Sequence, residues 1–281
     1  MPVAAEPALI ERAKQGDREA FSELYVPLER SLAAFLYRMV AARQDAEDLA
    51  QETALRALEG IAQFPGDGFR QTVSFRVWIF RIAAEAALDY LKSARRWDPG
   101  VVIRAFQRAA GHSSSRSKLV KLHKSRIHTT YNIREHIDFC FTCMSRTLPP
   151  QEAAALLLAG VHGLAWKEAA EIAGVSADVF RFRFEQARQT LVEHYDERCS
   201  LINKDGACSE CANLHTLLHA GRPPTEQALF QIDLQQHATP IARAGGFERR
   251  LAIVRAIDPL HAEGAKFHEL FMNLTREFSG Y

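Results

Sequence analysis

Five cysteines are the residues of this 281-residue chain whose chemistry and spacing stand out first. Cys140 and Cys143 form one Cys-x-x-Cys pair, Cys208 and Cys211 form a second, and Cys199 precedes the second pair. Each pair can supply two thiolates to a tetrahedral metal ion. We therefore expect one zinc ion bound by Cys140, Cys143, Cys208 and Cys211, which would join two segments that are distant in sequence.

Three alternatives for the cysteines stay open. In the first, His136, four residues before Cys140, or Cys199 replaces one of the four ligands. In the second, the thiols are free or redox-active, and Cys140 pairs with Cys143 on oxidation. In the third, the cysteines bind an iron–sulfur cluster or are buried spectators, because thiolate ligands alone do not distinguish zinc from iron–sulfur.

A second set of residues has the spacing of a DNA-binding helix-turn-helix. The pattern predicts a short helix over 166–173, a turn at Gly174, and a helix over 177–193 that Ser176 can cap. Arginines on the second helix can meet phosphates or guanine edges. The residues expected at the DNA are Ser176, Ala177, Asp178, Arg181, Arg183 and Arg188, whereas Val179, Phe180 and Ala187 are expected to pack inward. A helical hairpin with solvated arginines fits the spacing equally well.

A third set interleaves aromatic and basic residues on one amphipathic helix, expected over about 74–96. Such a surface can stack unpaired bases and hold the phosphate backbone of a single strand. The candidate contacts are Phe75, Trp78, Arg81, Lys92, Arg95 and Arg96. The alternative is that the aromatic residues are mostly core and that the basic end complements the helix dipole.

The elements that must position these residues are all helical, since strand-like alternation is nearly absent. We expect two small helical domains, at 1–96 and 136–198, joined by a basic linker at 97–135 and followed by a helical, cysteine-containing extension at 199–281. The linker holds eight Lys or Arg residues and two acidic residues. In the extension, His261, His268, Glu263 and Glu269 are expected on or near one helix, and the two histidines are expected on the surface, because their spacing is not that of a zinc protease motif.

Composition excludes several classes of protein. Hydrophobic residues make up 47% and charged residues 25% of the chain, as in soluble globular proteins, which excludes wholesale disorder. The sequence has no apolar run long enough for a transmembrane helix or a signal peptide. We therefore expect a cytoplasmic protein with no membrane partner, in agreement with an odd number of cysteines.

Three segments, in this order, resemble the sigma-70 family of bacterial RNA polymerase sigma factors, in the extracytoplasmic-function (ECF) group. Residues 45–58 resemble that family's polymerase-binding helix, 75–96 its promoter −10 melting and recognition helix, and 148–188 its −35-binding helix-turn-helix. The resemblance covers about residues 8–96 and 137–195. It departs from the family at Ala84-Glu85, where Arg-Asn is common, and at Phe182 and Phe184, where smaller or polar residues are usual. Base preference therefore does not carry over.

The resemblance implies a transcription initiation factor that binds core RNA polymerase and promoter DNA, with an anti-sigma factor as a possible regulator. It places polymerase contacts on the outer face of the 45–61 helix, at Asp48, Gln51, Glu52 and Arg56. No bond is made or broken in this role, so the chain is expected not to be an enzyme. Two rival functions are a metal- or redox-responsive DNA-binding regulator that does not use polymerase and a small metalloenzyme.

Overall fold

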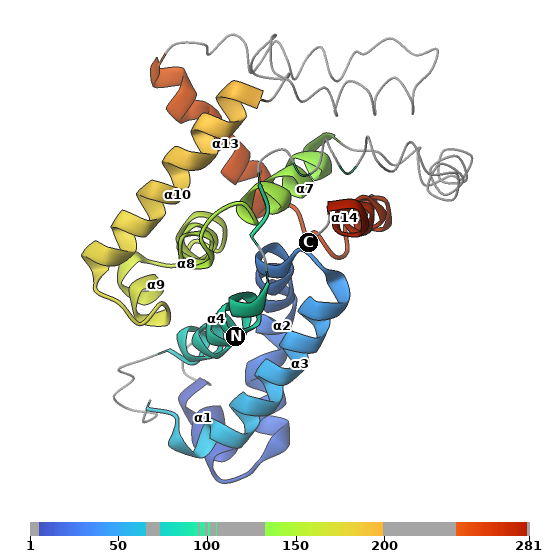
Figure 1. The fold of residues 1–281 in the computed structure, drawn as a ribbon. Coiled ribbons are helices and arrows are strands. Elements are labelled where there is room, and N and C mark those ends of the chain that lie inside the picture. Colours follow the sequence, from blue (N-terminus) through green and yellow to red (C-terminus); the bar gives the residue numbers. More distant parts are fainter. Residues whose placement is uncertain are drawn as a thin grey trace. The chain divides into compact units, whose positions relative to one another are not determined.

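The computed structural model describes residues 6–65, 74–94, 96–98, 101, 105, 133–198 and 240–279. Every regular element within these ranges is a helix, which confirms the all-α prediction for the described part of the chain (Figure 1). The chain divides into two compact units. The first combines Met1–Ala94 with Pro150–Phe184, and the second combines Arg95–Pro149 with Glu185–Tyr281.

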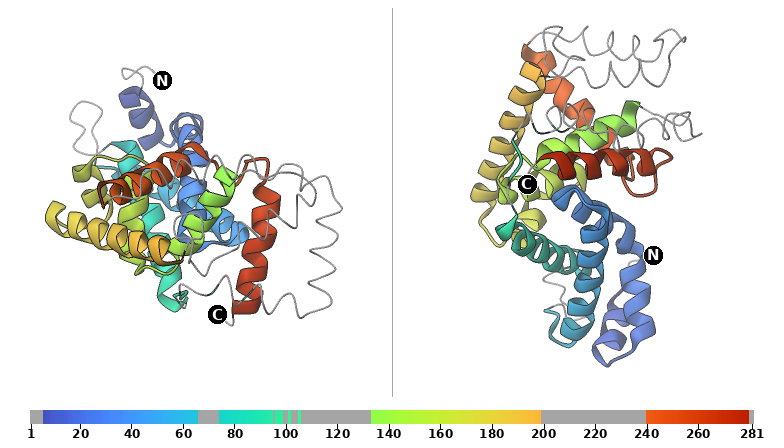
Figure 2. Two further views of the ribbon diagram at one scale, coloured as in Figure 1. Left: turned by 90° about the horizontal axis from the view of Figure 1, so that it is seen from above. Right: turned by 45° about the vertical axis from the view of Figure 1, so that its right-hand side comes forward.

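The first unit begins with four helices that pack side by side in all of the views (Figures 1 and 2). They are α1 (Glu6–Lys14), α2 (Arg18–Val40), α3 (Arg43–Gly60) and α4 (Phe75–Ser93), with a short 3-10 turn, η1 (Ile61–Gln63), after α3. A sharp turn joins α1 and α2. Gly16 has φ +93°, a conformation that favours glycine, and the Asp17 carboxylate accepts hydrogen bonds from the backbone N–H groups of Glu19 and Ala20.

Aromatic side chains form the centre of this four-helix core. Phe35 of α2 lies against Phe80 of α4, with ring centroids 5.7 Å apart, and Phe21 meets Phe75 edge-on at 6.1 Å. The buried positions in the first half of α2 recur every three or four residues, whereas every residue from Ala34 to Val40 is buried. This packing fixes which face of α4 is left for solvent.

The helix-turn-helix segment belongs to the same unit. It contains α8 (Pro150–Ala155), a π-helical turn η3 (Leu156–Val161), α9 (Trp166–Ile172) and the start of α10 (Ala177–Arg198). Trp166 packs edge-on against Phe180 and Phe184, with centroids 6.0 and 5.0 Å apart. His162 follows η3, and its ring lies 5.7 Å from Phe35 and 5.4 Å from Phe80.

The second unit contains α7 (Ile133–Ser145), α13 (Pro240–Ala256), α14 (Ala265–Ser279) and the later turns of α10. The Glu135 carboxylate at the start of α7 accepts a hydrogen bond from the backbone N–H of Gly264, at 2.7 Å, just before α14. Further along α7, the Cys143 thiol donates to the sulfur of Met272, at 3.7 Å. These contacts join residues that lie 129 positions apart.

Several local expectations need correction. α3 begins at Arg43 and not at Asp45, because Ala41 ends α2 in the left-handed region and Ala42 is already extended. α4 ends at Ser93 and not near Arg96, because Ala94 turns to an extended conformation. Val179 is exposed, since Phe180 occupies the inward position of that turn.

Other expectations lie outside the described residues. They include most of the 97–135 linker, Cys199, the Cys208–Cys211 pair and the first part of the extension expected to be helical over 199–281. The predicted domain boundaries at 96, 135 and 198 stay predictions.

Two phenylalanines of α10 make a matched test of this packing. Phe180 is fully buried, whereas Phe182 is 64% exposed. We expect Phe180→Ala to lower the free energy of unfolding by about 3–5 kcal/mol, because it leaves a cavity beside Trp166. Phe182→Ala should change it by less than about 0.5 kcal/mol. Urea titration of both variants measures the difference, and equal losses would contradict this arrangement of α10.

Candidate polymerase and nucleic-acid interfaces

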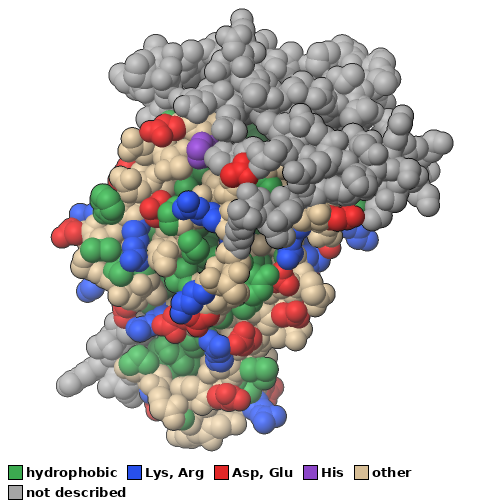
Figure 3. Space-filling model, in the orientation of Figure 1, with side chains coloured by type: hydrophobic (Ala, Val, Ile, Leu, Met, Phe, Trp, Pro, Cys, Tyr) green, Lys and Arg blue, Asp and Glu red, His purple; other side chains and the backbone are tan. Residues whose placement is uncertain are grey.

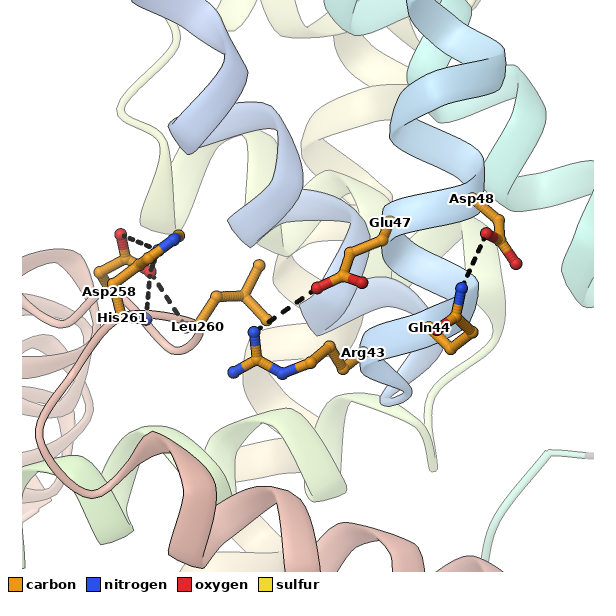
Figure 4. Close-up of polar contacts among 7 residues, drawn as sticks. All are labelled: Arg43, Gln44, Glu47, Asp48, Asp258, Leu260 and His261. Carbon is orange, nitrogen blue, oxygen red and sulfur yellow. Dashed lines mark hydrogen bonds and ion pairs between the residues drawn. The ribbon is translucent and has the colours of Figure 1, made fainter.

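The outer face of α3 is an acidic, solvent-exposed surface. Asp48, Gln51 and Arg56 are exposed, and Glu52 is half-exposed and forms an ion pair with Arg56. Figure 4 shows two further contacts at the start of this helix: the Gln44 amide donates to Asp48 at 3.0 Å, and Arg43 pairs with Glu47 at 3.5 Å. All four predicted polymerase contacts are therefore on the surface and on one helix.

Leu55 belongs to the same face and was missed by the sequence analysis. Its side chain is 61% exposed, and it lies between Glu52 and Arg56 along α3. An exposed leucine by itself needs no explanation. Among charged residues at a candidate docking face, however, it supplies the apolar contact that charge pairs lack. The signal in the sequence was a leucine outside the apolar stripe of Leu49, Thr53 and Ala57.

α4 places the predicted single-strand contacts in different environments. Phe75 is buried in the core, so its predicted contact with DNA is wrong for this conformation. Trp78 is half-buried, and its ring centroid lies 5.1 Å from Phe64. The basic residues Arg81, Lys92 and Arg96 are exposed, whereas Arg95 lies outside the described residues.

The exposed cations of α4 have acidic neighbours on their own helix. Arg81 pairs with Glu85 at 3.0 Å, and Lys92 pairs with Asp89 at 2.6 Å. Glu85 therefore neutralises an arginine and does not stand alone as a repulsive charge. Exposed pairs of this kind contribute less than about 1 kcal/mol, so a phosphate can compete for the cation.

A hydrogen bond between helices positions α3 and α4. The Tyr90 hydroxyl near the end of α4 donates to the Asp45 carboxylate at the start of α3, at 2.7 Å. It ties the acidic face of α3 to the basic end of α4. The acceptor Asp45 lies in the first turn of α3, where a negative charge also favours the helix dipole.

The turn between α9 and α10 has the predicted geometry. Gly174 has φ +63°, and its N–H and that of Val175 donate to Glu171 and Ala170, which satisfies the carbonyl groups at the end of α9. The Ser176 hydroxyl accepts from the N–H of Val179 at 3.3 Å and caps α10. The first turn of α10 therefore presents Ser176, Ala177 and Asp178 to solvent.

The arginines of α10 differ in their surroundings. The Arg181 guanidinium lies 5.9 Å from the centroid of the Trp166 ring, in a cation–π contact, and remains exposed. Arg183 is half-exposed. Arg188, three residues after Glu185, pairs with it at 2.7 Å. Arg181 and Arg183 are thus the cations best placed to meet a phosphate.

The charged side chains of the described residues, on the face drawn in Figure 3, are not gathered into one patch. On the face drawn in Figure 3, basic and acidic side chains of the described residues alternate, with hydrophobic side chains between them. The formal net charge of the whole chain is +1.

The second unit holds two of the predicted metal ligands and one alternative ligand. Cys143 is buried, Cys140 is half-exposed, and His136 is buried with its ring 5.4 Å from Phe139. Within the described ranges, no group of three or more His, Cys, Asp or Glu residues is arranged to hold a metal ion. Cys208 and Cys211 lie outside those ranges, so the four-cysteine site stays a prediction.

The histidines of the extension are not all on the surface, contrary to expectation. His261 is exposed and contacts the Asp258 carboxylate at 3.2 Å (Figure 4). His268 is buried, with its ring 5.4 Å from Phe139 and 5.7 Å from His136. The burial comes from α7, whose contact with α14 is not visible in the local spacing of the sequence.

Burial keeps three histidines neutral. It lowers the pKa of His162 from 6.5 to about 3, with the charges of Arg38 and Arg76 adding to the effect. Burial likewise lowers the pKa of His136 to about 3 and that of His268 to about 4. Each ring is therefore uncharged at neutral pH in the folded chain.

We expect acid to destabilise the fold through these rings. Between pH 6.5 and about 3 to 4, the unfolded chain binds protons that the folded chain does not, so the free energy of unfolding falls as the pH is lowered. One histidine contributes at most about 1.4 kcal/mol per pH unit. His162→Phe keeps a ring against Phe35 and Phe80. It should lower the dependence of the unfolding free energy on pH by the contribution of one proton, which is at most about 1.4 kcal/mol per pH unit.

Urea titrations at pH 7 and pH 5 give the change in unfolding free energy between the two pH values for variant and parent. The contributions of carboxylates are the same in both proteins, so they cancel in the comparison. His261→Gln is the matched control, because His261 is exposed, and it should keep the parental slope. An unchanged slope for His162→Phe would contradict the burial of this ring.

Three comparisons relate the chain to known proteins. The family model described as sigma-70 region 2 matches residues 24–97. The chain is 28% identical over 186 residues to the ECF RNA polymerase sigma-E factor of Haemophilus influenzae, covering 66% of this chain and 92% of that protein. It is 25% identical over 183 residues to the RNA polymerase sigma-H factor of Pseudomonas aeruginosa, covering 65% and 90%.

A solved structure of CnrH in complex with the cytosolic domain of CnrY is similar at 21% identity and a TM-score of 0.47, covering 68% of this chain and 97% of that one. Among the described helices, none is both long and apolar enough to cross a membrane.

Proposed function

We infer that this chain belongs to the sigma-70 family of RNA polymerase sigma factors, in its ECF group, and that it directs core RNA polymerase to promoters. The observation that carries this function is the match of sigma-70 region 2 to residues 24–97. That segment contains most of α2 and all of α3 and α4, and the last two hold the acidic face and the aromatic, basic helix. The family is not enzymatic, so no residue has a catalytic role.

Three surfaces of the chain would bind three different parts of the transcription complex. The acidic face of α3, with Leu55 at its centre, would bind the polymerase. The exposed basic side of α4 would hold the −10 region as it opens, and Trp78 is the half-exposed ring that could stack on an unpaired base. The helix-turn-helix of α9 and α10 would bind the −35 region, with Arg181 and Arg183 at the phosphates.

Run-off transcription tests the function directly. Purified core polymerase is incubated with genomic fragments, with and without this chain. We expect discrete transcripts only when the chain is present. Binding of DNA without capture of core polymerase, and no transcript from any fragment, would favour the rival regulator that does not use polymerase.

Charge reversal tests the polymerase face. We expect the double variant Asp48→Lys and Glu52→Lys to bind core polymerase at least about tenfold more weakly, because it places positive charge where an acidic face meets a basic partner. The matched control is Glu23→Lys with Glu29→Lys, a reversal of two exposed acids on α2. Affinity is measured by fluorescence titration with core polymerase. Equal affinities of the two double variants would refute the placement of this face.

We also propose that the chain binds one zinc ion through Cys140, Cys143, Cys208 and Cys211. The support is the repeated Cys-x-x-Cys spacing and the position of Cys140 and Cys143 one turn apart on α7. Zinc would take the place of the thiol proton that Cys143 now donates to Met272.

Metal analysis of protein purified without chelator tests this site. We expect about one zinc per chain, lost in Cys208→Ser together with the protease resistance of the C-terminal extension. Cys199→Ser is the control and should keep the metal. Retention of zinc in Cys208→Ser, or no metal in the parent protein, would contradict the four-cysteine site.

A further inference from the structure

The first three turns of α10 carry an exposed apolar pair that the fold does not need. Phe180 and Phe184 pack on Trp166 and are buried, but Phe182 between them is 64% exposed and Val179 is 43% exposed. Both are among the few large hydrophobic side chains that the described part of the chain leaves in water. Contact of these side chains with water is unfavourable in the isolated protein. Binding of a partner that covers them would therefore lower the free energy of the complex.

Helical geometry places Phe182 at the centre of the outer face of α10. Successive residues are about 100° apart around a helix. Phe180 and Phe184 are therefore both on the side opposite Phe182, and Arg181 and Arg183 flank it at about 100° on either side. Val179 lies one turn earlier on the same outer face. The arrangement is an apolar ridge with one arginine on each side, and the exposed acids Asp178 and Glu185 lie on the Arg181 side, where Glu185 pairs with Arg188.

This arrangement fits the major groove of a DNA duplex. The groove is about 12 Å wide and accepts a helix about 10–12 Å across. A ridge that points at the floor of the groove meets base edges, and cations on both flanks meet the phosphates of the two walls. The only apolar group that a base pair presents on that floor is the 5-methyl group of thymine.

We propose that Phe182 and Val179 read thymine methyl groups in the major groove of the promoter duplex, with Arg181 and Arg183 on the flanking phosphates. The proposal rests on the function inferred above and adds the base that this helix selects. Charge complementarity favours DNA over a protein as the occupant of this face, because the two flanking arginines match the two phosphate walls. The ring of Trp166 further holds the Arg181 guanidinium beside the ridge.

Removal of the methyl groups alone tests the proposal. The probe is a promoter duplex recovered by run-off transcription, and each thymine of its −35 half is replaced by deoxyuridine, which keeps every hydrogen-bonding group. The chain is used in complex with core polymerase. We expect affinity to fall about fourfold for each methyl group that the ridge contacts.

Variants assign the effect to the ridge. Phe182→Ala should bind the thymine duplex more weakly and no longer distinguish it from the deoxyuridine duplex. Arg183→Ala should weaken both duplexes by the same factor and reduce the salt dependence of binding, and it should keep the preference for thymine. Val26→Ala is the control for an exposed apolar side chain elsewhere and should behave as the parent does.

Three outcomes would overturn the proposal. The first is equal affinity of the parent complex for both duplexes. The second is a thymine preference that survives in Phe182→Ala with Val179→Ala. The third is unchanged DNA binding by that double variant with loss of binding to another protein, which would make the ridge a protein-docking face. In all three the chain still directs transcription, whereas failure of run-off transcription itself would refute the proposed function.

Discussion

The packing of α4 against α2 is the interaction on which the first unit depends. Phe75 and Phe80 take the inward side of α4 and meet Phe21 and Phe35 of α2. α4 buries one side of its surface in this contact, and Arg81, Glu85, Asp89 and Lys92 share the side that faces solvent. The surface available to a nucleic acid is therefore a consequence of the core, and moving an aromatic residue by one position would rotate the whole exposed face.

The same constraint explains why Phe182 of α10 remains in water. The sequence from Phe180 to Phe184 alternates apolar and polar residues, a pattern that suits a strand. In a helix the alternation cannot be satisfied on one side. Phe180 and Phe184, four residues apart, share the buried side, and Phe182 must lie opposite them. A local sequence that conflicts with its own secondary structure is most simply explained by a requirement for function.

Much of the fold could be predicted from the sequence because it depends on short-range signals. The Ser176 cap and the Gly174 turn each act within one or two turns of helix. The prediction that was wrong for His268 concerns contacts between residues distant in sequence. The burial of His268 depends on Phe139 of α7, and no local pattern reports a partner that lies more than a hundred residues away.

The candidate sites divide in the same way. The acidic residues on the outer face of α3 were predicted correctly as surface residues, because helical periodicity alone decides their exposure. Phe75 was assigned to a DNA contact because its type suits stacking, but type does not distinguish a stacking ring from a core ring. Leu55 was missed for the converse reason: its type suggests a core residue, and only its position on α3 places it in solvent.

The contact between α7 and the loop before α14 shows how little sequence is needed to hold the extension in place. The Glu135 carboxylate reaches the backbone N–H of Gly264, and burial raises its pKa. A Cβ at position 264 would collide with that carboxylate and press on the His268 ring. A side chain at this position would therefore displace the Glu135 carboxylate from the backbone N–H of Gly264, so glycine preserves this hydrogen bond between α7 and the loop before α14. Any metal bound by Cys140 and Cys143 would therefore act on a helix that is already fixed to the extension by an ordinary hydrogen bond.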